Sequence, residues 1–450
     1  MCTVYTVVGP LGKYAAALFL LKMQRFYQAC STRSGPTDAA CQRRELRRKQ
    51  PTDMSGSTRP ILVGAAAAAT ATATAVALLL RRRLLSSQST GGRRAAARLR
   101  AHFCRPVEAT QLELLRQSAG VELVDVSAGD AVPVDAEILI IDPRQLMNPS
   151  WRRDQDLAAL PSLRALVMPY AGILPEHLVE LRGLLGDGRL GSSVMLHNLH
   201  HNAPMTAEMG VALLLAAAKR LVPADRRLRQ GDWRPRGLPF PGATDIEPPM
   251  PMLLLEGRTA LVLGFGALGS RVARVLLALG MNVLATRRTA PKGGARSAEG
   301  IVVHPADALP QLLPQADVLM VCVPSTAETR QLIGEAELAL LPDQAIVVNV
   351  GRGEVLEERA LYEALRSGKL HGAGIDVWYS YPKSYGETSR TPPSSMPFGE
   401  LDSVVLSPHR GGGIGILDTE LLRMRHLGEM LRVAALGQPM PNAWNFDKGY

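Results

Sequence analysis

Two polar motifs in the second half of the chain contain residue types that suit the chemistry of a small carboxylic acid. Arg352 lies in the run Asn349-Val-Gly-Arg352-Gly353, and His409 follows Ser407-Pro408. The planar guanidinium group of arginine can bind a carboxylate through two hydrogen bonds. The imidazole of histidine titrates near neutral pH and therefore suits proton transfer.

Both motifs, and a third around Asp376, begin where an apolar run ends. The runs at 345–350, 372–377 and 404–406 are predicted strands. Ligands of open α/β sheets bind along the carboxyl edge of the strands. We therefore expect the three motifs to meet at one edge of a sheet.

A glycine motif in the same half of the chain predicts a dinucleotide-binding loop. The predicted strand 259–263 runs into Gly264, Gly266 and Gly269, and a predicted helix, 270–279, follows. In such a motif the first glycine permits a tight turn and the second lets the backbone approach a pyrophosphate. The third lets the helix pack on the strand, and the helix N-terminus presents unpaired N–H groups to the phosphates.

The end of the next predicted strand, 281–286, favours NADP(H). Enzymes that use NAD place an acidic residue there for the ribose 2′-hydroxyl, whereas this chain has Thr286, Arg287 and Arg288. The two arginines would attract a 2′-phosphate, and Thr286 can donate a hydrogen bond to it. NAD(H) remains the alternative.

The elements that must position these motifs alternate between short apolar runs and helical segments. Continuous apolar runs are typical of parallel strands that are covered on both faces. The sequence therefore predicts an α/β protein with two doubly wound domains. The first series of predicted strands is 121–126, 136–142, 163–168 and 193–196, and the second is 259–263, 281–286, 301–304, 318–323, 345–350, 372–377 and 404–406.

A helical segment from Met205 to roughly Arg229 separates the two series. Its centre, 211–218, is too apolar to face water, which predicts either a buried helix or a connector that packs in a dimer interface. The Pro-rich run 235–251 is expected to be a loop.

In combination and order, these motifs resemble those of the D-isomer-specific 2-hydroxyacid dehydrogenase family. Further matches are Tyr170-Ala-Gly172, the segment 198–208 and Trp233, and the resemblance covers about 120–435. It implies a Rossmann dinucleotide-binding domain at 204–410. It also implies a flavodoxin-like substrate domain built from 97–203 and 411–450, and a homodimer is the expected assembly.

The resemblance also implies roles for individual residues. Arg352 would hold the substrate carboxylate and polarise the keto oxygen, and His409 would donate a proton to that oxygen. Asp376 would lie near the nicotinamide, unless it serves only a local turn. The expected substrate contacts are Tyr170, Ala171, Gly172 and Arg352, and the expected cofactor contacts are Gly264, Gly266, Ala267, Leu268, Gly269, Thr286, Arg287, Arg288, Val323, Pro324, Asn349, Val350, Asp376, His409 and Gly411.

One position departs from the family pattern. The family carries a glutamate that pairs with the histidine, but Tyr381 occupies its place here. Glu387 and Glu400, in the loop that follows, are candidate replacements. The resemblance implies an NADP(H)-dependent reductase of a small 2-keto acid, such as glyoxylate or hydroxypyruvate. The alternatives are a dinucleotide-sensing protein without turnover and an enzyme for another small substrate, such as formate.

The segment that contains His200, His201 and Asn202 has no accompanying cysteines or carboxylates, so we expect no metal site. These three residues are either contacts for substrate or cofactor, or polar residues of a loop. The five cysteines show no metal-type spacing and no disulfide framework, which indicates a reducing compartment.

The basic charge of the chain is concentrated at its N-terminus. Residues 1–100 carry a net charge of +14 and the remainder −4, which argues against a nucleic-acid partner. The Arg- and Ser-rich composition of 1–96 predicts an unstructured leader that targets the protein to a plastid or mitochondrion. The uncharged stretch 61–80 is a marginal candidate for a membrane anchor, and Met54 is an alternative start that would make the upstream part an artefact.

Overall fold

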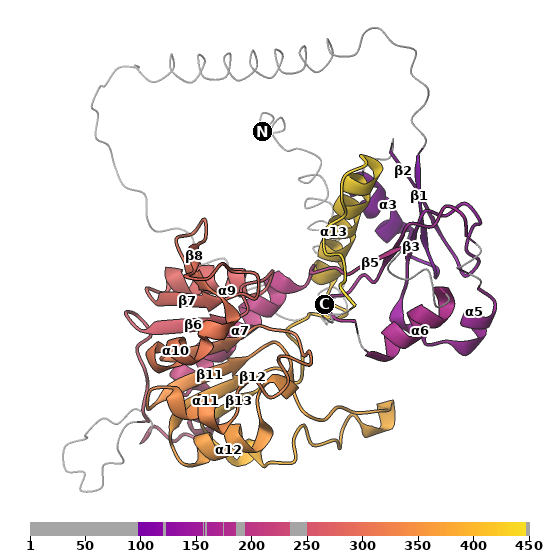
Figure 1. Ribbon diagram of the computed structural model, residues 1–450. Coiled ribbons are helices and arrows are strands. Elements are labelled where there is room, and N and C mark those ends of the chain that lie inside the picture. The colour runs from indigo at the N-terminus through magenta and orange to yellow at the C-terminus, as the bar shows by residue number, and fades with distance from the viewer. Residues whose placement is uncertain are drawn as a thin grey trace, which may run out of the picture. The chain divides into compact units, whose positions relative to one another are not determined.

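The computed structural model describes residues 98–446, apart from 120–122, 156, 158–159, 174, 186–193 and 235–249 (Figure 1). These residues belong to one compact unit of the chain, 93–450. The predicted leader 1–96, its segment 61–80 and most of the Pro-rich run 235–251 lie outside the described residues. Within the described part, no helix is long and apolar enough to cross a membrane.

The first sheet has five parallel strands in the order β2-β1-β3-β4-β5. This is the flavodoxin-like order, which confirms the predicted architecture. The short apolar strands β3 and β4 are buried along their whole length. The strands are β1 (Leu99–Phe103), β2 (Val124–Ala128), β3 (Ile138–Ile140), β4 (Ala165–Val167) and β5 (Met195–His197), and the helices between them are α3 (Ala109–Ala119), α4 (Pro143–Leu146), α5 (Pro149–Arg153) and α6 (Pro175–Leu185).

The C-terminal helix returns to this first sheet. α13 (Leu417–Ala435) packs against α3, with Met424, Leu427 and Leu431 in the same core as β1 and β2 (Figure 1). The two helices approach closely at Gly428, where a Cβ atom would lie 3.1 Å from the backbone of Ala119. The tail of the chain therefore covers the first sheet and not the second.

The second sheet has eight strands in the order β13-β12-β11-β10-β6-β7-β9-β8. Its central part, from β9 to β12, is the Rossmann order, again as predicted. β13 adds a parallel strand at one edge, and β8 pairs antiparallel with β9 at the other. The strands are β6 (Thr259–Leu263), β7 (Asn282–Thr286), β8 (Ala295–Arg296), β9 (Val302–His304), β10 (Val318–Val321), β11 (Ala345–Asn349), β12 (Leu370–Ile375) and β13 (Val404–Leu406).

Both faces of the second sheet are buried. Successive strand residues enter opposite cores, so that Leu261 and Val347 lie in one core while Val262 and Ile346 lie in the other. The helices on the two faces explain why the strands are continuous apolar runs (Figure 1). They are α7 (Ala203–Ala218) and α9 (Gly269–Ala278) on one face, and α10 (Leu309–Leu312), α11 (Glu335–Leu340) and α12 (Glu358–Arg366) on the other.

Three sequence-based assignments were wrong in detail. β1 was not predicted, because Arg100 and His102 interrupt its apolar pattern, and the two-residue β8 was also missed. The helix expected at 205–229 is two helices, α7 and α8 (Leu221–Leu228). They are separated at Arg220, whose backbone is left-handed with φ +48°.

The apolar centre of α7 packs on the second sheet. At Gly374 of β12 a Cβ atom would lie 2.7 Å from the Cβ of Leu213, so only glycine lets the helix approach this closely. Val211, Leu213, Leu214, Ala217 and Ala218 of the apolar run 211–218 are buried, whereas Leu215 and Ala216 are half-buried and Ala212 is exposed.

Candidate active site

The glycine motif has the geometry that a pyrophosphate-binding loop requires. Gly264 has φ +100°, and a Cβ atom there would lie 2.6 Å from Cγ1 of Val323. At Gly269 a Cβ atom would overlap the carbonyl oxygen of Gly264, so the start of α9 packs directly on the loop. At Gly266, by contrast, a Cβ atom would meet nothing within 4 Å, which leaves the backbone open to a ligand. This arrangement fits a dinucleotide.

This loop lies at the carboxyl end of β6, where the strand order of the sheet reverses between β6 and β10. Ligands of open α/β sheets bind at such a position. Ala267 and Leu268, the other predicted loop contacts, lie between Gly266 and α9, and the carbonyl oxygen of Ala267 accepts a 2.6 Å hydrogen bond from Nη1 of Arg271. Val323 and Pro324 follow β10 beside the loop.

The end of β7 contains the residues predicted to choose between the two dinucleotides. Thr286 is buried, and its hydroxyl oxygen lies 3.4 Å from the backbone nitrogen of Gly264, from which it accepts a hydrogen bond. The side chain of Thr286 therefore stabilises the first residue of the glycine loop. Arg287 is exposed, and Arg288 forms an ion pair with Glu328 at 3.2 Å. The two arginines are thus the groups at this strand end that can meet a phosphate.

The side chains of Asn349 and Val350 are used within the protein. The amide of Asn349 donates to the carbonyl oxygen of Arg352 at 2.9 Å and accepts from the backbone nitrogen of Gly351 at 3.1 Å. Val350 is buried against Gly210 of α7. The side chain of Asn349 therefore stabilises the turn that carries Arg352, and contact of Asn349 and Val350 with the cofactor stays a prediction.

Arg352 lies against the Tyr170–Gly172 segment that follows β4. Its guanidinium contacts Gly172, where a Cβ atom would overlap it, and Nη1 donates a 2.7 Å hydrogen bond to the carbonyl oxygen of Gly351. Among the described residues, no carboxylate oxygen lies within ion-pair distance of Arg352, and the backbone N–H groups of Ala171 and Gly172 donate to no protein acceptor. Within the described part of the chain, Arg352 therefore lies beside Gly172 without a carboxylate partner.

His409 is held in place by Asp376. The buried carboxylate of Asp376 accepts hydrogen bonds from the hydroxyl of Ser407, from the backbone nitrogen of Arg410 at 2.9 Å and from that of Gly411 at 2.8 Å. His409, between these donors, has the left-handed backbone angle φ +56°. That conformation is unfavourable for a residue with a Cβ atom, so the hydrogen bonds to Asp376 stabilise it.

These contacts give Asp376 and Gly411 structural roles, and their predicted contacts with the cofactor stay predictions. Both carboxylate oxygens of Asp376 bind the 407–411 loop, which supports its local structural role. Gly411 is buried, and a Cβ atom there would lie 2.6 Å from Oδ2 of Asp376. The glycine therefore allows this close contact, and its carbonyl oxygen accepts a 3.0 Å hydrogen bond from Thr206 of α7.

Tyr381 does lie beside His409, at the position where the family has an acid. The two ring centroids are 5.5 Å apart, and the Tyr381 hydroxyl oxygen accepts a 2.9 Å hydrogen bond from the backbone nitrogen of Trp378. Burial raises the pKa of Tyr381, so the phenol is neutral at neutral pH. Tyr381 therefore gives His409 a ring contact but no negative charge.

The charges that act on His409 come from Arg352 and Asp376. Partial burial lowers the pKa of the imidazole, the positive charge of Arg352 lowers it further, and Asp376 opposes both effects. Glu387 accepts from the backbone nitrogen of Lys383 at 2.9 Å, and Glu400 ends the short turn η7 (Phe398–Glu400). Neither is among the charges that shift the pKa of His409, so the structure does not support either as the replacement acid.

Trp378 connects the loop of Arg352 with the loop of His409. The sequence did not indicate this role. Its indole nitrogen donates to the carbonyl oxygen of Ser407 at 2.8 Å. At Gly353 a Cβ atom would overlap the carbonyl oxygen of Trp378, so the turn after Arg352 packs on the same residue. The signal for this role in the sequence is a tryptophan two residues after Asp376.

The ring of Tyr170 packs between the side chains of Arg423 and His201. The guanidinium carbon of Arg423 lies 5.1 Å from the centre of its ring, and the ring of His201 lies 6.5 Å away. Burial, reinforced by the charge of Arg423, lowers the pKa of His201 to about 4, so this histidine is neutral. The face of the Tyr170 ring therefore serves packing, and the predicted contact of the Tyr170–Gly172 segment with a substrate stays a prediction. Arg423 was not predicted, although it interrupts the apolar face of α13.

His200 lies near Arg271 of α9, whose charge adds to burial in lowering the pKa of the imidazole. Asn202 precedes α7 without capping it through its side chain. Within the described residues, no group of histidine, cysteine or acidic side chains is arranged to hold a metal ion.

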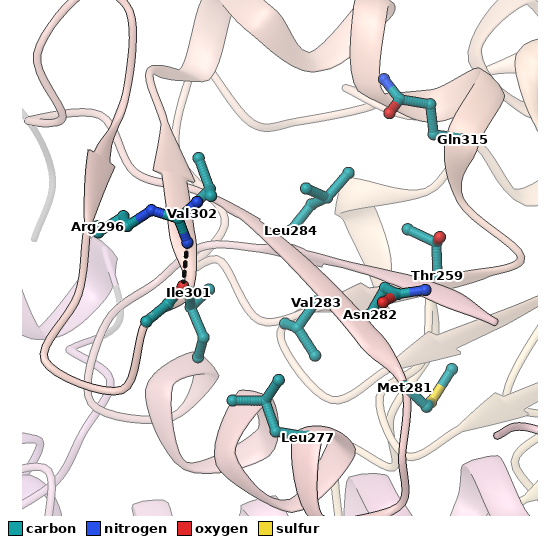
Figure 2. Close-up of a pocket in the computed structure, with 11 residues that line it drawn as sticks. Thr259, Leu277, Met281, Asn282, Val283, Leu284, Arg296, Ile301, Val302 and Gln315 are labelled. Carbon is teal, nitrogen blue, oxygen red and sulfur yellow. Dashed lines mark hydrogen bonds between the residues drawn. The ribbon is translucent and has the colours of Figure 1, made fainter. Parts of the chain in front are cut away.

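A cavity of about 370 Å³ lies away from these motifs (Figure 2). Its lining includes Thr259 and Asn282, the first residues of β6 and β7, and Leu277 near the end of α9. It therefore opens at the amino edge of the second sheet, opposite the glycine loop. Arg296, on its rim, donates to the carbonyl oxygen of Gly300 at 3.0 Å.

Known proteins share both the sequence pattern and the architecture. The family model for the NAD binding domain of D-isomer specific 2-hydroxyacid dehydrogenases matches residues 211–411. A glyoxylate reductase from Thermococcus onnurineus is 37% identical over 210 residues, which are 46% of this chain and 56% of that protein. A D-3-phosphoglycerate dehydrogenase from Archaeoglobus fulgidus is 39% identical over 208 residues, or 46% and 35%. The chain thus spans about half the length, or less, of these relatives.

Solved structures extend the likeness to the first sheet. A D-isomer specific 2-hydroxyacid dehydrogenase from Xanthobacter autotrophicus, in complex with NADPH and MES, is 25% identical with a TM-score of 0.56, and the match covers 79% of this chain and 100% of that one. A glyoxylate reductase from Paecilomyes thermophila shares the fold at 21% identity, with a TM-score of 0.53 and coverage of 78% and 100%. Residues 211–411 thus resemble the NAD binding domain of D-isomer specific 2-hydroxyacid dehydrogenases, and the two sheets are similar to those of a solved structure of that family.

Proposed function

We propose that this protein reduces a small 2-keto acid, such as glyoxylate or hydroxypyruvate, with NADPH as the hydride donor. The observation that carries the proposal is the contact of the Arg352 guanidinium with Gly172, in a segment where the backbone N–H groups of Ala171 and Gly172 have no acceptor among the described residues. A cation and two N–H donors match the two oxygens of a carboxylate. The names of the relatives that act on glyoxylate support the substrate class.

The residues divide the work as follows. Arg352 binds the carboxylate and leaves part of its charge for the adjacent keto oxygen, where negative charge develops. His409, on the neighbouring loop, donates the proton to that oxygen. The dinucleotide, when bound, supplies the hydride. Asp376 acts indirectly, because it fixes the loop on which His409 lies.

The experiment that tests this function follows NADPH oxidation with a panel of 2-keto acids. We expect turnover with one or more small keto acids and none with neutral ketones, because Arg352 requires a carboxylate. Tight NADPH binding without turnover on any keto acid would instead favour a dinucleotide sensor, the alternative that the uncharged Tyr381 supports.

The preference for NADPH rests on Arg287 and Arg288 at the end of β7. Replacing Arg287 with aspartate removes one attraction for the 2′-phosphate and adds a repulsion. A charge-assisted contact contributes about 1.5–3 kcal/mol, so we expect the ratio of NADPH to NADH affinity to fall by at least about tenfold. Equilibrium titration of the wild type and Arg287→Asp with both cofactors measures this ratio. An unchanged ratio would refute the cofactor assignment.

The pH dependence of the reduction rate should show that His409 has no acidic partner. Reduction needs protonated His409, so its rate falls as the pH rises through the pKa of the imidazole, which is already lowered by burial and Arg352. In Tyr381→Glu an ionised carboxylate would raise that pKa. We therefore expect the descending limb of the kcat/KM profile to move upward by about one pH unit.

Tyr381→Phe serves as the control, because it keeps the ring beside His409 and introduces no charge. Its profile should overlay that of the wild type. A profile that stays fixed in Tyr381→Glu would mean that another group than His409 limits the reaction at high pH.

A further inference from the structure

An ion pair bridges two strands that are not neighbours in the second sheet. Arg288 follows β7 and Glu328 follows β10, and their Nη1 and Oε2 atoms are 3.2 Å apart. β6 lies between these two strands, with the glycine loop at its carboxyl end. The pair therefore connects the two sides of the position where the adenosine part of a dinucleotide binds.

Glu328 lies in a turn that is stabilised by hydrogen bonds of the next residue, Thr329. The hydroxyl of Thr329 donates to the carbonyl oxygen of Pro324 at 2.6 Å and accepts from the backbone nitrogen of Thr326 at 2.8 Å. The Glu328 side chain is 67% exposed, whereas that of Arg288 is 30% exposed. Its carboxylate therefore stays near Arg288 but remains accessible to a ligand.

The position of this acid has consequences for both dinucleotides. The end of β7 lacks the acidic residue that binds the ribose 2′-hydroxyl of NAD, and Glu328 is the carboxylate paired with Arg288 there. A 2′-hydroxyl can donate a hydrogen bond to Glu328. A 2′-phosphate instead repels Glu328 and competes with it for the guanidinium of Arg288.

We propose that Glu328 determines how strongly the protein discriminates between the two dinucleotides, by competing with the 2′-phosphate for Arg288. This inference rests on the proposed use of NADPH. Because exposed ion pairs are weak, removing Glu328 should tighten NADPH binding by about two- to fivefold. Binding of NADH should stay the same or weaken, since its 2′-hydroxyl loses an acceptor.

The test measures dissociation constants for NADPH and NADH, by nicotinamide fluorescence, in the wild type and in Glu328→Gln. Adenosine 2′,5′-bisphosphate and AMP, titrated by calorimetry, repeat the comparison without the nicotinamide. Asp343→Asn is the matched control, because Asp343 forms a 2.7 Å ion pair with Lys369 elsewhere on the same domain. Its affinities should equal those of the wild type.

The outcomes separate this inference from the proposed function. Tighter NADPH and bisphosphate binding in Glu328→Gln, without tighter NADH binding, supports the competition. A wild type that prefers NADPH, with Glu328→Gln unchanged or equally tighter for both cofactors, overturns the competition alone. Equal wild-type affinities, with a preference for NADPH appearing in Glu328→Gln, would overturn the proposed preference while supporting the competition.

Discussion

Replacing Arg352 with alanine is expected to lower kcat/KM for the keto acid by between about a hundredfold and ten-thousandfold. The guanidinium lies against Gly172, and no described carboxylate pairs with it. Loss of two charge-assisted hydrogen bonds, each worth about 1.5–3 kcal/mol, accounts for this range. Steady-state kinetics at saturating NADPH measure the effect.

Two further variants make the Arg352 experiment specific. Arg288→Ala removes a guanidinium of the same domain that is proposed to contact only the cofactor, so at saturating NADPH it should leave kcat/KM for the keto acid nearly unchanged. Arg352→Lys keeps the charge but loses the planar pair of donors, and its loss should be intermediate. Equal, mild losses in Arg352→Ala and Arg288→Ala would mean that Arg352 only supports the structure of its turn.

Replacing His409 with asparagine is expected to lower kcat by about a hundredfold to ten-thousandfold, the usual contribution of a positioned general acid. Asparagine also tolerates the left-handed backbone that position 409 requires, with φ +56°. The loop bound to Asp376 should therefore persist. Single-turnover rates measured across a pH range test this expectation.

The affinity for NADPH should change little in His409→Asn, because the glycine loop and the end of β7 remain intact. The dependence of the rate on the ionisation of residue 409 should also disappear. A variant that keeps the wild-type descending limb would show that His409 is not the proton donor, even if its rate is low.

The sequence predicted an element most accurately where steric requirements within a few residues determine its structure. The strand 259–263 and its three glycines follow from steric requirements that act within a few residues, and the structure has them as predicted. Reasoning was weaker where local signals conflicted. Arg100 and His102 concealed β1, and Pro223, which marks the start of α8 just after the break at Arg220, was overlooked in the helical pattern of 205–229.

Side-chain roles within the candidate site could be predicted only in part. Arg352 and His409 follow strands at the carboxyl edge of the sheet, as predicted; Arg352 is half-buried and His409 is exposed. The side chain of Asn349 binds backbone groups of its own turn, whereas those of Thr286 and Asp376 bind backbone groups of other loops. The partners of Thr286 and Asp376 are distant in the chain, and no spacing rule predicts them.

The sequence by itself determined the α/β class and the dinucleotide loop, and it indicated Arg352 and His409 as candidates for the chemistry, because short-range sterics and strand order suffice for these. The tertiary structure alone decided which groups meet across the sheet edge. It placed Tyr381 beside His409 and directed Glu387 elsewhere, and it paired Arg288 with Glu328. Such pairings depend on how non-adjacent loops fold over the strands, and charge and pKa depend on those distances.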